Sequence, residues 1–386
     1  MKKVIVFGAG QIGRGFIGEL CFDSEYFIVF VDVDEKIVDL LNKEGKYKIY
    51  LLGGKKEEKF ITNFKAINLK NEDEIIKEFS EAEIVFTSVG AKNLFSLSEI
   101  FAKGIKEKFK NGSFLNIVIC ENLLGAGEKL KREILNKGLL EKKEIDFLNK
   151  NVGFVETVIS RMTSPLTEEE KKENPLLVKV EPYKILPVDK NGFKGKIPEI
   201  VGFLPVSNLH QYEELKLFGH NLSHVSLAYY GYLKGYTYIW QCVEDKEILN
   251  LLLNVQKEIK EALIKKYNFG KEELENYFSD LNMRFDNKLL GDTIYRVGRE
   301  PLRKISKNER IVGAINLCLE YNIFPENVCF VLATALCYNY SLDRESIELQ
   351  EIKKKRGIDF VLEEICGIYN EKIKKRVKEI YKKVKK

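Results

Sequence analysis

The chain has 386 residues, which is enough for two domains with full hydrophobic cores. Hydrophobic residues make up 45% of it and charged residues 31%, a composition that excludes an intrinsically disordered protein. Its 63 basic and 58 acidic residues leave a net charge of +5 with both signs interspersed, which argues against a polyanion-binding protein.

The cysteines and apolar runs indicate the compartment. Seven cysteines stand mostly within apolar stretches and include no CxxC pair, which favours reduced thiols over a disulfide framework. The apolar start of the chain stops after Phe7, too soon for a signal peptide. The longest later apolar run, 328–338, is shorter than the roughly 20 residues that span a bilayer. We therefore expect a cytoplasmic protein without a membrane partner.

A glycine-rich segment follows the first predicted strand. The run 4–7 is entirely apolar, as in a parallel strand buried on both faces, and it leads into the sequence GAGQIG and a helical pattern. A second predicted strand, 27–31, ends at Asp32, close to the spacing of about 20 residues expected for this motif. A bare GxGxxG is weak evidence, but strand, turn, helix and acid together are the dinucleotide-binding pattern.

Each part of this pattern has a physical role. Gly8 permits the tight turn, Gly10 lets the backbone approach a pyrophosphate, and Gly13 lets helix and strand pack closely. Asp32 accepts hydrogen bonds from the adenosine ribose and repels a 2′-phosphate, so NAD is favoured over NADP. A glycine turn without a ligand is the alternative. The predicted cofactor-binding residues are Gly8, Ala9, Gly10, Gln11, Ile12, Gly13 and Asp32.

Further apolar runs predict more strands of the same sheet, at 84–90, 114–120 and 152–159. The second of them is followed by Glu121 and Asn122. Ligands of such sheets bind beyond the carboxyl ends of the strands, so Asn122 is placed to meet a substrate. A turn-forming asparagine is the alternative. From about residue 208 the pattern becomes helical nearly to the end of the chain.

The segment 216–224 opens an apolar, aromatic run that predicts a buried helix. At about 100° per residue, Asn221 lies about 140° and His224 about 80° from Lys216, so the three share one face. Buried lysine is rare without a partner or a task, and here an imidazole and an amide stand beside it. A boundary helix with a snorkelling lysine is the alternative.

The same segment also raises the question of a metal site, because His220 and His224 are four residues apart. The residues between them contain no glutamate of the HExxH kind. No cysteine or carboxylate pattern completes a zinc set, so we expect no metal.

Two basic segments follow. Residues 296–304 contain four cations, and Arg299, Arg303 and Lys304 are candidates for gripping an anionic substrate, with a solvated loop as the alternative. Residues 371–386 combine apolar positions at helical spacing with eight lysines and one arginine. We expect a docked terminal helix there, not a membrane surface or a nucleic-acid-binding element.

Together these motifs resemble the long-chain polyol-specific dehydrogenases over nearly the whole chain. The resemblance is carried by the glycine loop through Gly18, by Cys120-Glu-Asn122, by 152–155, by Lys216-x4-Asn221-x2-His224 and by 296–304. It implies an α/β fold: a Rossmann-type doubly wound sheet with appended strands over 1–205, and a mostly α-helical domain over 206–386.

The resemblance also implies an activity. It is the reversible, metal-independent transfer of hydride between NAD and the carbon bearing the 5-hydroxyl of mannitol 1-phosphate, giving fructose 6-phosphate. Lys216 is implied as the general base, Asn122 and Asn221 as donors to the developing alkoxide, and His224 as a group that holds the substrate or orients the lysine. Other polyols, polyol phosphates and hexuronates are the alternative substrates. No obligate protein partner is expected.

Overall fold

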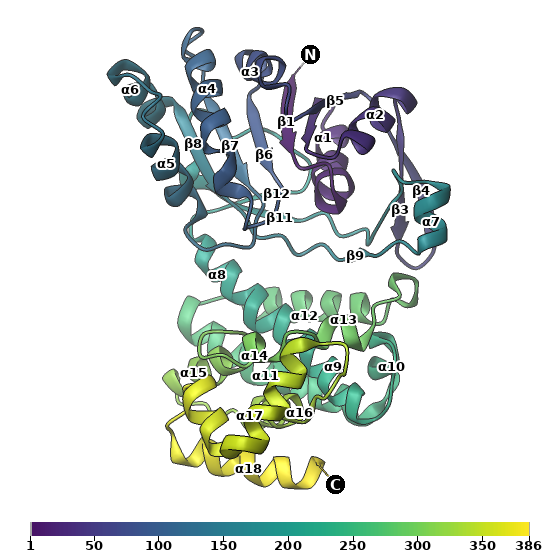
Figure 1. The fold of residues 1–386 in the computed structure, drawn as a ribbon. Coiled ribbons are helices and arrows are strands. Elements are labelled where there is room, and N and C mark those ends of the chain that lie inside the picture. Colours follow the sequence, from purple (N-terminus) through teal and green to yellow (C-terminus); the bar gives the residue numbers. More distant parts are fainter. Residues whose placement is uncertain (1, 386) are drawn as a thin grey trace. The chain divides into compact units, whose positions relative to one another are not determined.

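The computed structural model describes residues 2–385 and divides into two compact units (Figure 1). Unit 1 ends at Tyr212 and unit 2 begins at Glu213. The division falls within α8 (Leu209–Glu214), whereas the sequence-based boundary lies after residue 205.

Unit 1 is built on a six-stranded parallel sheet. Its order is β5-β2-β1-β6-β7-β8, so the sheet's own strands run 3-2-1-4-5-6, the Rossmann order with the reversal between β1 and β6. The predicted α/β fold is confirmed. The strands are β1 (Lys3–Phe7), β2 (Phe27–Asp32), β5 (Phe64–Asn68), β6 (Ile84–Thr87), β7 (Leu115–Ile119) and β8 (Val152–Glu156).

Side chains that alternate along the strands form a core on each face of this sheet. Val4 and Val6 join one core, which includes side chains of the first two α-helices, and Ile5 and Phe7 join the other, covered by the next four. Figure 1 shows α4, α5 and α6 side by side on their face. The helices are α1 (Gly18–Asp23), α2 (Glu35–Glu44), α3 (Glu72–Glu81), α4 (Ser98–Phe109), α5 (Ala126–Asn136) and α6 (Lys142–Asn151), with the 3-10 turn η2 (Leu94–Leu97) before α4.

The expected appended strands form two small sheets. One has the order β4-β3-β10-β9, and the other pairs β11 with β12 in parallel. Val178, Val180, Leu186 and Val188 add these sheets to the first of the two cores. The elements are β3 (Tyr47–Leu52), β4 (Lys56–Ile61), β9 (Thr163–Ser164), α7 (Glu168–Glu173), β10 (Val178–Val180), β11 (Leu186–Asp189), η3 (Lys190–Gly192) and β12 (Phe203–Val206).

The named elements of unit 2 are all helices across its described residues, 213–385. The helix α9 packs against α10, α11, α13 and α16, so it lies at the centre of the bundle. After α8, the elements of unit 2 are η4 (Leu215–Asn221), α9 (Leu222–Leu233), α10 (Ile239–Glu244), α11 (Lys246–Tyr267), α12 (Lys271–Phe285), η5 (Lys288–Leu290), α13 (Ile294–Gly298), α14 (Pro301–Lys304), α15 (Val312–Glu320), α16 (Glu326–Cys337), α17 (Arg344–Phe360), η6 (Val361–Ile365) and α18 (Glu371–Val384).

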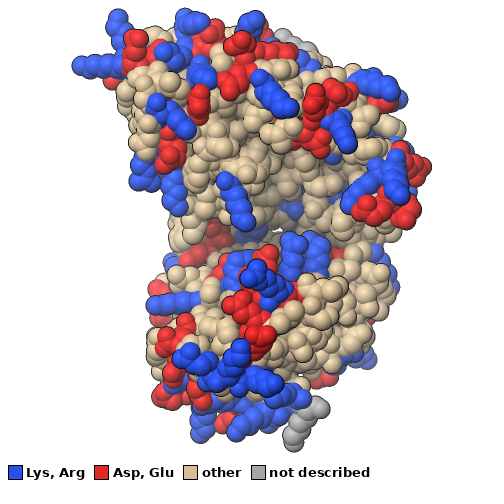
Figure 2. Space-filling model, in the orientation of Figure 1, with Lys and Arg blue, Asp and Glu red and all other residues tan. Residues whose placement is uncertain are grey.

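The basic C-terminal helix is docked, as expected. Ile373, Val377 and Ile380 of α18 are buried, and α18 packs along α16. Its cations are partly neutralised, since Lys374 pairs with Glu363 and Lys378 with Asp359. Figure 2 shows basic and acidic side chains interspersed over the face that it draws. Within residues 2–385, no helix is long and apolar enough to cross a membrane, and all seven cysteines are free.

Candidate active site

The glycine loop of unit 1 is shaped by contacts that exclude side chains. Gly8 has φ +95°, its N–H donates to Val31 O at 2.8 Å, and a Cβ there would lie 2.5 Å from Ser88 O. A Cβ on Gly13 would lie 1.8 Å from Gly8 O. Gly10 differs, because it is exposed and its Cβ would meet nothing within 4 Å. The first and third glycines therefore serve packing, and the second leaves its backbone open to a ligand.

The helix that follows this loop begins with a π-helical turn, η1 (Gly13–Ile17), in which the Gly18 N–H donates to Gly13 O. Such turns occur frequently at functional sites. Arg14, within η1, is buried, and its Nε donates to Ala9 O at 2.6 Å while its Nη1 donates to Leu176 O. Burial lowers the pKa of this guanidinium. Arg14 thus joins the backbone of the glycine loop at Ala9 to the backbone at Leu176.

Asp32 stands at the end of β2, beside the loop. Its Oδ2 accepts from Ala9 N at 2.6 Å and its Oδ1 from Asp34 N at 2.9 Å. A carboxylate offers about four acceptor positions, so two such bonds orient Asp32 and leave capacity for ribose hydroxyls. The next side chain, Val33, is 70% exposed and carries no cation for a 2′-phosphate.

Glu121 and Asn122 follow β7. Glu121 is buried, with its carboxylate accepting from Thr87 Oγ1 at 2.5 Å and from Val89 N at 2.9 Å. Burial raises the pKa of this carboxyl, opposed by these hydrogen bonds. Glu121 therefore ties together the carboxyl ends of β6 and β7, whereas Asn122 is exposed at the same edge of the sheet.

In unit 2, Lys216 and Asn221 lie on a π-helical segment, η4, in which the Leu222 N–H donates to Leu217 O. The regular α-helical rotation expected between these two residues is therefore wrong. A π-helix bonds residue i to i+5 and so has more residues per turn, which brings side chains five positions apart toward the same side. The prediction of a buried helix after this segment is confirmed, because Val225, Leu227 and Ala228 of α9 are fully buried.

Lys216 has a lowered basicity. It is half-buried, and burial together with the positive charge of Arg310 lowers the pKa of its ammonium to about 8. The carboxylate of Glu213 opposes this shift. A lysine with such a pKa exists in both protonation states near neutral pH, as a residue that exchanges protons requires.

His224 is held by two side chains from other parts of unit 2. Its Nε2 lies 2.7 Å from Asp292 Oδ2, and its ring stacks on Phe285 with centroids 4.8 Å apart. The other oxygen of Asp292 accepts from Arg296 Nε at 2.8 Å and Nη2 at 2.7 Å. Burial would raise the pKa of Asp292, but His224 and Arg296 hold it below its usual range. The carboxylate is thus ionised, and both of its oxygens are in contact with cationic or polar side chains.

The three candidate phosphate contacts differ in their surroundings. Lys304 is buried, and its Nζ donates to Val297 O at 2.5 Å and to Arg299 O. Burial, with the charge of Arg310, lowers the pKa of Lys304 to about 7. Arg303 pairs with Glu300 and Glu309, whereas Arg299 is exposed.

The two histidines considered as metal ligands lie with ring centroids 5.9 Å apart. His220 is buried, and burial, with the charge of Arg284, lowers its pKa well below the usual range. Across residues 2–385, no group of three or more His, Cys, Asp or Glu side chains is arranged to hold a metal ion.

Comparison with known proteins places both units in one family. The Rossmann-domain model of mannitol dehydrogenases matches residues 2–202, and the C-terminal-domain model matches residues 208–386. The chain belongs to the mannitol dehydrogenase family. The resemblance drawn from the sequence motifs is thereby confirmed.

Relatives within the mannitol dehydrogenase family are similar over almost the full length. The mannitol-1-phosphate 5-dehydrogenase of Caldanaerobacter subterraneus subsp. tengcongensis is 38% identical over 372 residues, which cover 96% of this chain and 95% of that protein. The enzyme of the same name from Bacillus subtilis (strain 168) is 36% identical over 363 residues, with 94% of each chain covered.

Solved structures support the fold of this mannitol dehydrogenase family member. A D-sorbitol dehydrogenase in substrate-free form aligns with a TM-score of 0.81, at 16% identity over 99% of this chain and 93% of that one. The Pseudomonas fluorescens mannitol 2-dehydrogenase, solved with NAD and D-mannitol, aligns with a TM-score of 0.70, also at 16% identity, over 100% of this chain and 91% of that one. At these identities the likeness concerns the fold.

Sequence reasoning missed Arg14, Asp292 and Arg310. Arg14 had a local signal, because a cation inside an otherwise small and apolar helix start needs buried acceptors. Asp292 lies 68 positions from the histidine that it contacts, and nothing in a single sequence links the two.

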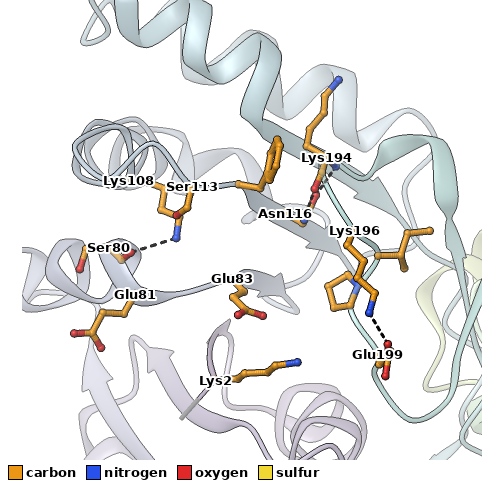
Figure 3. A pocket seen from close by; sticks show the side chains of 13 residues that line it. Lys2, Ser80, Glu81, Glu83, Lys108, Ser113, Asn116, Lys194, Lys196 and Glu199 are labelled. Carbon is orange, nitrogen blue, oxygen red and sulfur yellow. Dashed lines mark hydrogen bonds and ion pairs between the residues drawn. The ribbon is translucent and has the colours of Figure 1, made fainter.

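A pocket of about 660 Å³ lies elsewhere in unit 1, at the amino ends of the sheet strands (Figure 3). Ligands of such sheets bind at the opposite, carboxyl ends. Its buried cation, Lys108, donates to Ala82 O at 2.7 Å and Ser80 O at 3.2 Å, so it caps the carbonyls at the end of α3. Lys196 pairs with Glu199 on one side of the pocket. Lys108, Lys196 and Glu199 therefore have structural explanations.

Proposed function

We propose that this protein is an NAD-dependent dehydrogenase that interconverts D-mannitol 1-phosphate and D-fructose 6-phosphate. The observation that carries the reaction type is Lys216, with its pKa of about 8, in one helical segment with Asn221 and His224. The substrate is proposed from the relatives named mannitol-1-phosphate 5-dehydrogenase, which this chain matches over about 95% of their length.

The cofactor site is proposed on the glycine loop. The open backbone at Gly10 and the N-terminus of the following helix suit a pyrophosphate, because free N–H groups there bind anions. Asp32 would accept hydrogen bonds from the adenosine ribose, and its charge would disfavour NADP. NAD supplies the hydride acceptor when bound. The rest of the chemistry falls to the chain's own side chains, without a metal.

Lys216 is the proposed general base. In the oxidation, its neutral amine takes the proton of the 5-hydroxyl while hydride leaves the carbon that bears this hydroxyl. In the reduction, the ammonium form returns that proton to the carbonyl oxygen. Burial and the charge of Arg310 lower its pKa enough for both forms to be populated near neutral pH.

The amides of Asn122 and Asn221 are the proposed donors to the developing alkoxide. Preorganised donors of this kind stabilise charge that appears only in the transition state. His224, held by Asp292 and Phe285, is proposed to hold a substrate hydroxyl. For the phosphate we propose Arg299 first, because it is exposed, and Arg303 second, because it is already paired with two carboxylates.

A substrate panel tests this function. Purified protein is offered mannitol 1-phosphate, other polyol phosphates and free polyols with NAD⁺ or NADP⁺, and hexuronates with NADH or NADPH. Formation or consumption of the reduced cofactor is followed by absorbance. We expect mannitol 1-phosphate with NAD⁺ to give the highest kcat/KM. A higher kcat/KM with a hexuronate or an unphosphorylated polyol would mean that this compound, and not mannitol 1-phosphate, is the substrate. Equal efficiency with NADP⁺ would contradict the role of Asp32.

A further inference from the structure

The contact between His224 and Asp292 determines which nitrogen of the imidazole carries a proton. An ionised carboxylate can only accept hydrogen bonds. Asp292 is ionised, because its contact with His224 and the two hydrogen bonds that Arg296 donates to its Oδ1 keep its pKa low against the effect of burial. The ring nitrogen 2.7 Å from Asp292 Oδ2 is Nε2, so Nε2 must be the donor.

Asp292 is itself fixed by the backbone around it. Its carbonyl accepts from Ile239 N at 2.9 Å, and the next residue, Thr293, forms a β-bridge with Tyr238. Ile294 N then donates to Thr237 O at 2.9 Å. The carboxylate is only 9% exposed. It is therefore a rigid partner and not a mobile surface group.

The imidazole is equally constrained. Its ring lies nearly parallel to that of Phe285, at 29°, and its backbone belongs to the buried helix α9. Rotation of the ring would break the contact with Asp292 and the stacking together. With Nε2 occupied, Nδ1 is the nitrogen left for other contacts.

We infer that Asp292 is a positioning residue that holds His224 as the Nε2–H tautomer, so that the imidazole meets the substrate through Nδ1 as a hydrogen-bond acceptor. The inference rests on the proposed function, in which His224 holds a substrate hydroxyl. An accepting Nδ1 suits a further hydroxyl of the polyol, which donates a hydrogen bond to it, and leaves the proton of the 5-hydroxyl to Lys216. Asp292 acts through His224 and does not itself touch the substrate.

The tautomer can be measured without any turnover. The chain has three histidines, so ¹⁵N-histidine labelling gives three imidazole spin systems, and His224→Gln identifies which one belongs to His224. In the wild type we expect a protonated Nε2 and an unprotonated Nδ1 for His224. A protonated Nδ1, with or without a proton on Nε2, would overturn the inference, whatever the activity of the protein.

Kinetics of Asp292→Asn test the consequence for function. We expect kcat to fall about 10–100-fold, by analogy with the loss when the partner that orients a metal-bound histidine is removed. NADH binding should stay at the wild-type level. Asp292→Glu, which keeps a carboxylate, should retain the Nε2–H tautomer and more of the activity than Asp292→Asn.

Asp245→Asn is the matched control. Asp245 lies in the same unit, its side chain is 14% exposed, and it pairs with Lys234 at 3.0 Å while capping α11. If Asp292→Asn loses no more activity than Asp245→Asn, Asp292 is merely structural and the inference is wrong. Failure of the proposed function looks different: the wild type would then not oxidise mannitol 1-phosphate, while the tautomer of His224 would still decide the inference.

Discussion

The two regions proposed to act are built in opposite ways. In unit 1, the proposed cofactor region is one contiguous loop, in which Gly10 leaves its backbone open and Gly13 is pressed against Gly8 O. In unit 2, the proposed catalytic region consists of side chains on separate elements: Lys216 on η4, His224 on α9 and Asp292 just before α13. The first region thus depends on positions that lack a side chain, and the second depends on which side chains are present.

This difference teaches what each region tolerates. Adding a methyl group to the loop should weaken cofactor binding and leave the chemistry of bound substrate unchanged. Removing a side chain from the proposed catalytic region should lower kcat and leave cofactor binding unchanged. Both regions also contain a π-helical turn, η1 or η4, at the residues proposed to act.

The largest effect is expected for Lys216→Ala. Turnover should fall by several orders of magnitude, since general base catalysis alone is typically worth about 10²–10⁴-fold. NADH should still bind with wild-type affinity, measured by fluorescence titration. Lys260→Ala, which removes a lysine paired with Glu275 on the surface of α11 and α12, is the control and should keep its activity. Near-normal turnover of Lys216→Ala per folded molecule would show that Lys216 has only a structural role.

Asn221→Ala should have the next largest effect. As one donor of a shared alkoxide site it is expected to cost about 10²-fold in kcat. Because η4 brings positions five apart toward the same side, Asn221 should act together with Lys216. The double variant should therefore lose less than the product of the two single losses. If the loss of the double variant equals the product of the two single losses, Asn221 and Lys216 act independently.

Two glycine substitutions sharpen the other half of the comparison. Gly10→Ala should fold as the wild type does, because its Cβ meets nothing within 4 Å, but its NADH affinity should fall about 10-fold, roughly 1.4 kcal/mol. Gly13→Ala should lower the melting temperature as well, because its Cβ would collide with Gly8 O. At saturating cofactor and substrate, Gly10→Ala should recover wild-type kcat. A kcat defect that persists at saturation would break the division between binding and chemistry.

The smallest effect is expected at the cation cluster. Arg299→Ala should lower the preference for mannitol 1-phosphate over mannitol about 10-fold, and Arg303→Ala should lower it less, because Glu300 and Glu309 already engage that guanidinium. The measurement is the ratio of kcat/KM values for the two substrates. An unchanged ratio in both variants would assign the phosphate to other residues.

The comparison also explains what could be predicted from the sequence. The form of the glycine loop and the place of Asp32 were predictable, because strand, turn, helix and acid follow one another in the chain and Gly8 and Gly13 each meet a local steric demand. Lys216, Asn221 and His224 were found together because they are neighbours in sequence. The π-turn between them was not predicted, since an extra residue per turn leaves no mark in the apolar pattern.

Long-range partners were beyond sequence reasoning. Asp292 reaches His224 only because the chain folds back through α10, α11 and α12, and Arg310 affects Lys216 from a segment beyond α14. Lys304 looked like part of an anion site in sequence, yet tertiary packing buries it against backbone carbonyls.

The central claim is that Lys216 exchanges the substrate proton, and the pH dependence of kcat/KM in both directions tests it most directly. The pKa of Lys216 is lowered to about 8, and only the neutral amine accepts a proton. Oxidation of mannitol 1-phosphate should therefore rise with pH through about 8 and then level off, whereas reduction of fructose 6-phosphate should fall through the same pH. Profiles that move in the same direction, or that show no transition near this pH, would contradict the assignment of Lys216 as the base.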